Sequence, residues 1–121
     1  MTIQPIAAGI PVVDDVVVAR LRLLRDQVAR PGEDVLGELL ALFERDALLR
    51  LHAIAEAIRA GSSEGRRQAA HALKGSAGNV GAARVAALAA HVENNPCLAD
   101  VVARLEQEIA VAVAALRLRL A

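Results

Sequence analysis

Apolar residues recur every three or four positions along most of the chain, the spacing of one face of an α-helix. The longest example starts after Glu33 and Asp34 and stops at Gly61. Its apolar positions are Leu36, Leu40, Phe43, Ala47, Leu51, Ile54 and Ile58. This pattern predicts a long helix with one buried face, because acidic residues favour a helix start and glycine favours a helix end.

A shorter helix is predicted before the long one, from Val13 to about Ala29. Asp14 or Asp15 can cap its start, and Arg30-Pro31-Gly32 ends it because proline cannot continue the helical hydrogen bonds. The positions that share one face are Val17, Leu21, Leu24 and Val28. Residues 1–12 are apolar but interrupted by prolines and a glycine, which predicts an extended arm, with a frayed terminus as the alternative.

Three more helices are predicted in the second half of the chain. The first runs from Ser62 or Ser63, as cap, to Gly81, and its core-facing positions are Ala70, Leu73, Ala77 and Val80. The second covers residues 82–93, with a stripe of Val85, Leu88 and Val92. The third is expected to be capped by Asn95, to begin at Pro96 and to extend for about 24 residues. Its stripe is Val102, Leu105, Ile109, Ala112, Val113, Leu116 and Leu120.

These elements predict an all-α fold, since no alternating strand pattern competes with them. The connections between helices are short, which favours antiparallel neighbours. We therefore expect an antiparallel up-and-down four-helix bundle with an additional short N-terminal helix. In domain terms, residues 1–12 form the arm and residues 13–121 form one helical domain.

Composition narrows the possible partners and locations. Hydrophobic residues make up 55% of the 121 positions but aromatic residues only 1%, so the core must be built from small aliphatic side chains. Fourteen Lys and Arg balance fourteen Asp and Glu, which argues against nucleic acid or an anionic membrane as partner. The longest charge-free run, residues 1–13, is too short to cross a bilayer. Cys97 is the single cysteine and cannot form an internal disulfide, so we expect a cytoplasmic protein.

The helix predicted over residues 62–80 carries the most distinctive chemistry. His71 is followed by Lys74 and Gly75, three and four positions later, which places all three on one exposed face. A glycine inside a helix costs about 1 kcal/mol relative to alanine, and here it would give a large partner access to the imidazole. The lysine would favour an anion on the ring. These residues favour a phosphoryl acceptor over the alternative, an ordinary bundle helix with a half-buried histidine.

Residues 70–82, AHALKGSAGNVGA, resemble the signature of histidine-containing phosphotransfer (Hpt) domains, and the likeness extends over residues 13–120. The resemblance implies that His71 is phosphorylated, that Lys74 stabilises the phosphoryl group and that Gly75 leaves room for a receiver domain. The partner-binding face would consist of Arg67, Gln68, Lys74, Gly75 and Gly78. The family also places a carboxylate or amide on the next helix, at the position of Glu93. Such a group would accept a hydrogen bond from Nδ1 and leave Nε2 as the nucleophile; a solvated helix-end carboxylate is the alternative.

By this resemblance the chain is a phosphorelay intermediate, which takes a phosphoryl group from one receiver aspartate and gives it to another without turnover of its own. We expect no cofactor or metal on the chain, with Mg²⁺ on the receiver only, a monomeric state, and either a free-standing protein or a part of a hybrid histidine kinase. No Glu-x-x-His pair is present for a metal pair, and no Walker loop for a nucleotide.

Two alternatives remain. One is a helical interaction module that sequesters a receiver or another regulator without using His71. The other is the acceptor domain of a histidine kinase, which is disfavoured because Ala72, and not an acid, follows His71.

Overall fold

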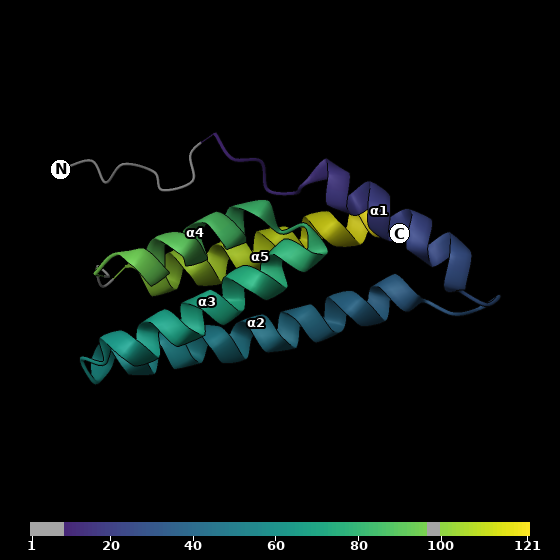
Figure 1. Ribbon diagram of the computed structural model, residues 1–121. Coiled ribbons are helices and arrows are strands. Elements are labelled where there is room, and N and C mark those ends of the chain that lie inside the picture. The colour runs from purple at the N-terminus through teal and green to yellow at the C-terminus, as the bar shows by residue number, and fades with distance from the viewer. Residues whose placement is uncertain (1–8, 97–99) are drawn as a thin grey trace.

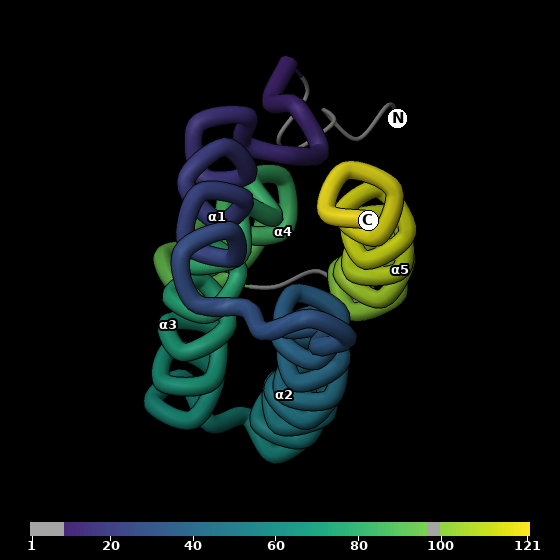
Figure 2. The backbone as a smooth tube through the Cα atoms, turned by 90° about the vertical axis from the view of Figure 1, so that its right-hand side faces the viewer, coloured from purple at the N-terminus to yellow at the C-terminus, as the bar shows by residue number. Residues whose placement is uncertain are grey.

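The computed structural model describes residues 9–96 and 100–121, and in these ranges every regular element is a helix. The elements are α1 (Asp15–Val28), α2 (Val35–Arg59), α3 (Ser63–Val80), α4 (Ala83–Asn94) and α5 (Val101–Leu120). Helices α2 to α5 run up and down beside one another, and α1 lies at the end of the bundle near the C-terminus (Figures 1 and 2). The predicted all-α bundle with an additional N-terminal helix is confirmed.

The core consists of the aliphatic stripes that the sequence predicts. The seam of α2 is buried from Leu36 to Ile54, and Ala57 joins it while Ile58 is partly buried. On α3 the predicted positions are at most 3% exposed. The stripes of α4 and α5 are also buried, except that Val101 replaces Val102 as the first buried residue of α5. Burying a leucine or valine side chain stabilises the fold by roughly 1.5–3 kcal/mol, so these stripes hold the helices together.

Local caps fix where the helices begin and end. Asp14 accepts hydrogen bonds from the backbone of α1, Asp34 caps α2, and the Ser62 hydroxyl accepts one from the Gly65 amide at 3.0 Å. Gly81 has a φ of 83°, a left-handed conformation that glycine adopts without strain, and it ends α3 as predicted. The Gly81 carbonyl also accepts a hydrogen bond from the Asp14 amide at 2.8 Å. The start of α1 is therefore tied to the turn between α3 and α4.

The predicted start of the last helix was wrong. Asn95 has extended backbone angles and follows the last turn of α4, and its side-chain amide donates to the His91 carbonyl at 3.0 Å. It therefore ends α4 and does not cap α5, which begins at Val101 and has 20 residues. Cys97, the single cysteine, lies outside the described residues.

The predicted face of α1 was also wrong in its second half. Val18 is fully buried, whereas Leu24 is 47% and Val28 is 61% exposed. The reason is position: this half of α1 extends past the last turn of α3 and the first turn of α4 (Figure 1). Arg22 donates to the Arg119 carbonyl and Arg25 to that of Leu120 at 3.2 Å. The positive charges of Arg22 and Arg25 interact favourably with the negative C-terminal end of the α5 dipole. These contacts hold α1 against the end of α5.

Of the predicted arm, residues 1–8 lie outside the described residues. In the remainder, the Ile10 carbonyl accepts a hydrogen bond from Arg84 at 3.0 Å and Val12 packs against the core. No helix in the described parts of the chain combines the length and the hydrophobicity needed to cross a bilayer.

Candidate functional site

His71 lies on the outer face of α3. The residues beside it on the inner face, Ala70 and Leu73, are fully buried, which fixes the rotation of the helix. The His71 side chain is consequently turned outward and is 68% exposed. An imidazole in this position is open to a macromolecular partner.

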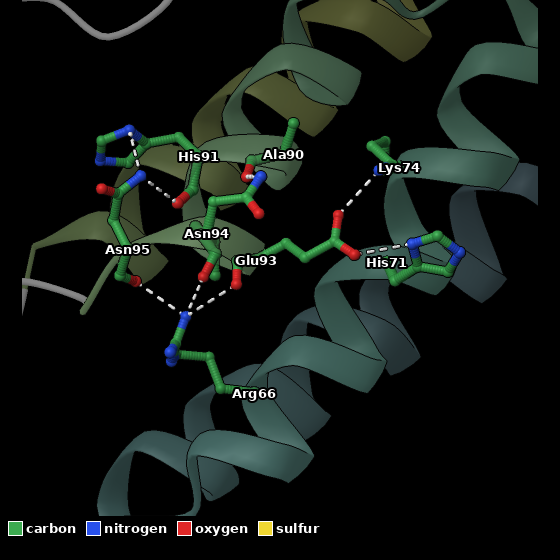
Figure 3. Close-up of polar contacts among 9 residues, drawn as sticks. Arg66, His71, Lys74, Ala90, His91, Glu93, Asn94 and Asn95 are labelled. Atoms are coloured by element: carbon green, nitrogen blue, oxygen red, sulfur yellow. Dashed lines mark hydrogen bonds and ion pairs between the residues drawn. The ribbon is translucent and has the colours of Figure 1, made fainter.

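Glu93 of α4 connects His71 and Lys74. One carboxylate oxygen, Oε2, lies 2.7 Å from Nδ1 of His71, and the other, Oε1, lies 2.8 Å from the Lys74 ammonium. Figure 3 shows the carboxylate between the two side chains, with the second ring nitrogen on the far edge of the imidazole. The structure therefore brings together three of the site residues predicted from the sequence: His71 and Lys74 on α3 and Glu93 on α4.

The charge of Glu93 determines which imidazole nitrogen carries the proton. The hydrogen bond from Lys74 is the main cause that lowers the pKa of Glu93, and the hydrogen bond with His71 lowers it further, while partial burial opposes both. The carboxylate is therefore ionised at neutral pH and can only accept hydrogen bonds. Nδ1 must then be the donor, which leaves the lone pair of a neutral ring on Nε2.

Gly75 and Gly78 are not required by packing within the domain. A Cβ atom added at either position would meet nothing within 4 Å in the structure. Each glycine nevertheless lowers helix stability by about 1 kcal/mol relative to alanine. Glycines often allow a neighbouring helix to pack closely, but no helix in the described part of the chain lies close enough for this to apply at Gly75 and Gly78. The two glycines therefore leave open space beside His71 on the outer face of α3.

The remaining predicted face residues, Arg67 and Gln68, are exposed one turn before His71. The Gln68 amide donates to Glu64 at 3.1 Å along the helix surface. Beyond Gly75, a shallow groove lies between α2 and α3, and sequence reasoning did not identify it. Its lining residues are Leu39, Leu42, Phe43, Asp46, Ser76, Asn79 and Val80. Leu42 could have indicated this groove in the sequence, because it is an apolar residue outside the buried positions of α2. In the structure its side chain is 59% exposed.

Arg66 is a second residue that sequence reasoning missed. It is only 9% exposed, and its guanidinium donates to backbone carbonyls at the end of α4, including those of Val92 and Asn95. The signal was its position: Arg66 stands four residues before Ala70 and seven before Leu73, on the buried stripe of α3. Across residues 9–96 and 100–121, no group of three or more His, Cys, Asp or Glu side chains is arranged to hold a metal ion.

Comparisons with known proteins agree with this geometry. The model of the Hpt domain family matches residues 38–118, more than half of the chain. The structure is similar to the crystal structure of histidine-containing phosphotransfer protein B (HptB) from Pseudomonas aeruginosa PAO1, with a TM-score of 0.74 and 25% sequence identity. The match covers 92% of this chain and 96% of that one. A search of curated proteins found no match. The chain belongs to the Hpt domain family, the histidine phosphotransfer intermediates of phosphorelay signalling.

Proposed function

We propose that Nε2 of His71 is the atom that receives the phosphoryl group. The observation that carries this assignment is the 2.7 Å contact between Nδ1 and the Glu93 carboxylate on an imidazole that is 68% exposed. One nitrogen is occupied as a donor inside the domain, and the other is available to an incoming group. The phosphoryl group would come from the aspartyl phosphate of one receiver domain and pass to the aspartate of another.

In the transfer step, the Nε2 lone pair attacks phosphorus in line with the bond to the aspartate oxygen. The N–P bond forms as the P–O bond breaks, and the aspartate leaves as a carboxylate. The ring gains positive charge, which the Glu93 carboxylate on Nδ1 stabilises without taking the proton. Lys74, 2.8 Å from the same carboxylate, adds positive charge near the phosphoryl oxygens. The reverse sequence delivers the group to the next aspartate.

The receiver would dock on the outer face of α3, over Arg67, Gln68, Gly75 and Gly78. The groove beside Leu42 would add apolar contact area next to the acceptor. In this proposal the receiver brings the Mg²⁺ and much of the electrostatic stabilisation. The domain acts as a monomer in the cytoplasm, and its receivers belong either to separate proteins or to a parent hybrid histidine kinase.

The test is transfer of label from a phosphorylated receiver. Wild-type protein should become labelled and His71→Gln should not. His52→Gln is the matched control, because His52 is also exposed but lies on α2. Equal labelling of His71→Gln and wild type would overturn the assignment. Unlabelled wild type that still binds the receiver, with the same affinity as His71→Gln, would support the non-catalytic interaction module instead.

A further inference from the structure

Arg66 is unusual among the core residues. Within residues 9–96 and 100–121 it is the only polar or charged residue counted as buried, at 9% exposure. It stands on α3, five residues before His71, and its side chain reaches toward α4. Burying a charged group is unfavourable unless hydrogen bonds compensate, so the contacts of this guanidinium need an explanation.

Within the described residues, the hydrogen bonds of the guanidinium go to backbone carbonyls at the end of α4. One guanidinium nitrogen, Nη1, donates to the carbonyls of Val92 and Asn95, the latter at 2.7 Å, and lies 3.4 Å from that of Glu93. The last four carbonyls of a helix have no partner within the helix. α4 ends at an extended Asn95 without a capping glycine, and the Asn95 side-chain amide donates to the His91 carbonyl. Arg66 adds donors from α3 to the carbonyls that follow. Its charge also complements the negative end of the helix dipole.

The residue held in this way is the partner of His71. Glu93 is the second-to-last residue of α4, where helices fray most readily. Its backbone is fixed by Arg66 on one side, and its carboxylate by His71 and Lys74 on the other (Figure 3). Three side chains of α3 thus clamp one residue of α4.

We propose that Arg66 is a positioning residue for phosphotransfer. It holds the last turn of α4 so that the Glu93 carboxylate stays on Nδ1 of His71, and it does not touch the imidazole itself. This inference rests on the proposed function of His71. Without Arg66, the last turn of α4 would move relative to α3, and the imidazole would sample orientations and tautomers that do not present the Nε2 lone pair.

The experiment compares Arg66→Met, Arg66→Lys and the double variant Arg66→Met/Glu93→Ala. Arg66→Met should slow transfer by roughly five-fold under conditions where the protein is fully folded, a typical coupling for residues in one hydrogen-bonded network. In the Glu93→Ala background the same substitution should have almost no further effect. Nitrogen NMR of His71 should show a single tautomer in wild type and a mixture in Arg66→Met. Arg66→Lys, which keeps the charge and one donor group, should be intermediate.

Arg84→Met is the matched control. Arg84 also donates to a backbone carbonyl, that of Ile10, but it lies nine residues before Glu93, about 13 Å along α4. Its loss should lower stability and leave both the transfer rate and the His71 tautomer unchanged.

Two outcomes would overturn the inference: a wild-type tautomer and transfer rate in folded Arg66→Met, or a five-fold loss that persists in the Glu93→Ala background. If Arg66→Met does not fold, Arg66→Lys in both backgrounds decides the same question. Failure of the proposed function is recognised separately, because His71→Gln would then be labelled like wild type.

Discussion

The two faces of α3 differ in burial and in packing. On the inner face, Ala70, Leu73 and Ala77 are fully buried against the neighbouring helices. On the outer face, His71 is 68% exposed, and the space around Gly75 and Gly78 is open. Because a helix turns about every 3.6 residues, these faces alternate within nine consecutive residues of the chain.

Within this one helix, the inner face contributes to stability and the outer face carries the proposed functional residues. The inner face is packed closely enough that removing a methyl group is felt. The outer face contains glycines that lower helix stability and a histidine that contacts Glu93 through Nδ1. Shortening a side chain on the inner face and filling a glycine on the outer face should therefore change stability in opposite directions. Of these two kinds of substitution, only the second should change transfer directly.

The largest effect is expected from Leu73→Ala on the inner face. The substitution leaves a cavity between α3 and its neighbours and should reduce the free energy of unfolding by about 2–5 kcal/mol. Urea unfolding measures this loss. The transfer rate per folded molecule should stay close to wild type, and a variant with normal stability but slow transfer would contradict the division between the two faces.

Gly75→Ala should have the reverse signature. The new Cβ meets open space, so stability should rise by about 1 kcal/mol, while transfer slows because the methyl group lies where the receiver approaches. Thermal unfolding and the transfer assay measure the two effects. Gly37→Ala is the contrast, since its Cβ would overlap the Asp34 cap and should destabilise α2. Normal transfer by Gly75→Ala would show that the partner does not come close at this point.

The smallest effect concerns the ionisation of Glu93. Lys74→Met should raise the pKa of Glu93 toward its ordinary value, because the hydrogen bond from Lys74 is the main cause that lowers it. His71→Gln should raise this pKa by less. Titration of the Glu93 carboxyl carbon by NMR measures both shifts.

The lowered pKa of Glu93 also determines how the stability of the domain should change with pH. A carboxylate with a pKa lowered by folding contributes stability above its ordinary pKa, and this contribution is lost as the pH falls through the lowered value. The stability advantage of wild type over Lys74→Met should accordingly shrink in acid. An advantage that grows in acid, or an unchanged pKa of Glu93 in Lys74→Met, would show that Lys74 does not hold this charge.

The sequence was sufficient where burial follows from local periodicity. The seam of α2 runs from Leu36 to Ile54 along a helix that packs over its whole length, so spacing alone identifies its buried positions. The outer face of α3 could be predicted in the same way, since His71, Lys74 and Gly75 share a side of the helix. The bound partner of His71, Glu93, was placed by resemblance, and the structure brings its carboxylate to the ring.

Sequence reasoning failed where the position of a helix in the bundle decides burial. Leu24 and Val28 have helical spacing but lie on a part of α1 that extends beyond its neighbours. Asn95 and Pro96 resemble a helix start, yet the Asn95 side chain bonds backward to α4. Arg66 stands on the buried stripe of α3, but a charged side chain is normally exposed, and only the approach of the α4 terminus makes its burial favourable.

The exposure of His71 would also limit how long a phosphoryl group on it survives. If Nε2 carries the phosphoryl group, the N–P bond stands in the same water that a receiver must cross to reach it. Hydrolysis and delivery then compete, and the signal lasts only as long as the phosphohistidine survives. An acceptor this open would suit rapid transfer between receivers better than long-term storage of the phosphoryl group.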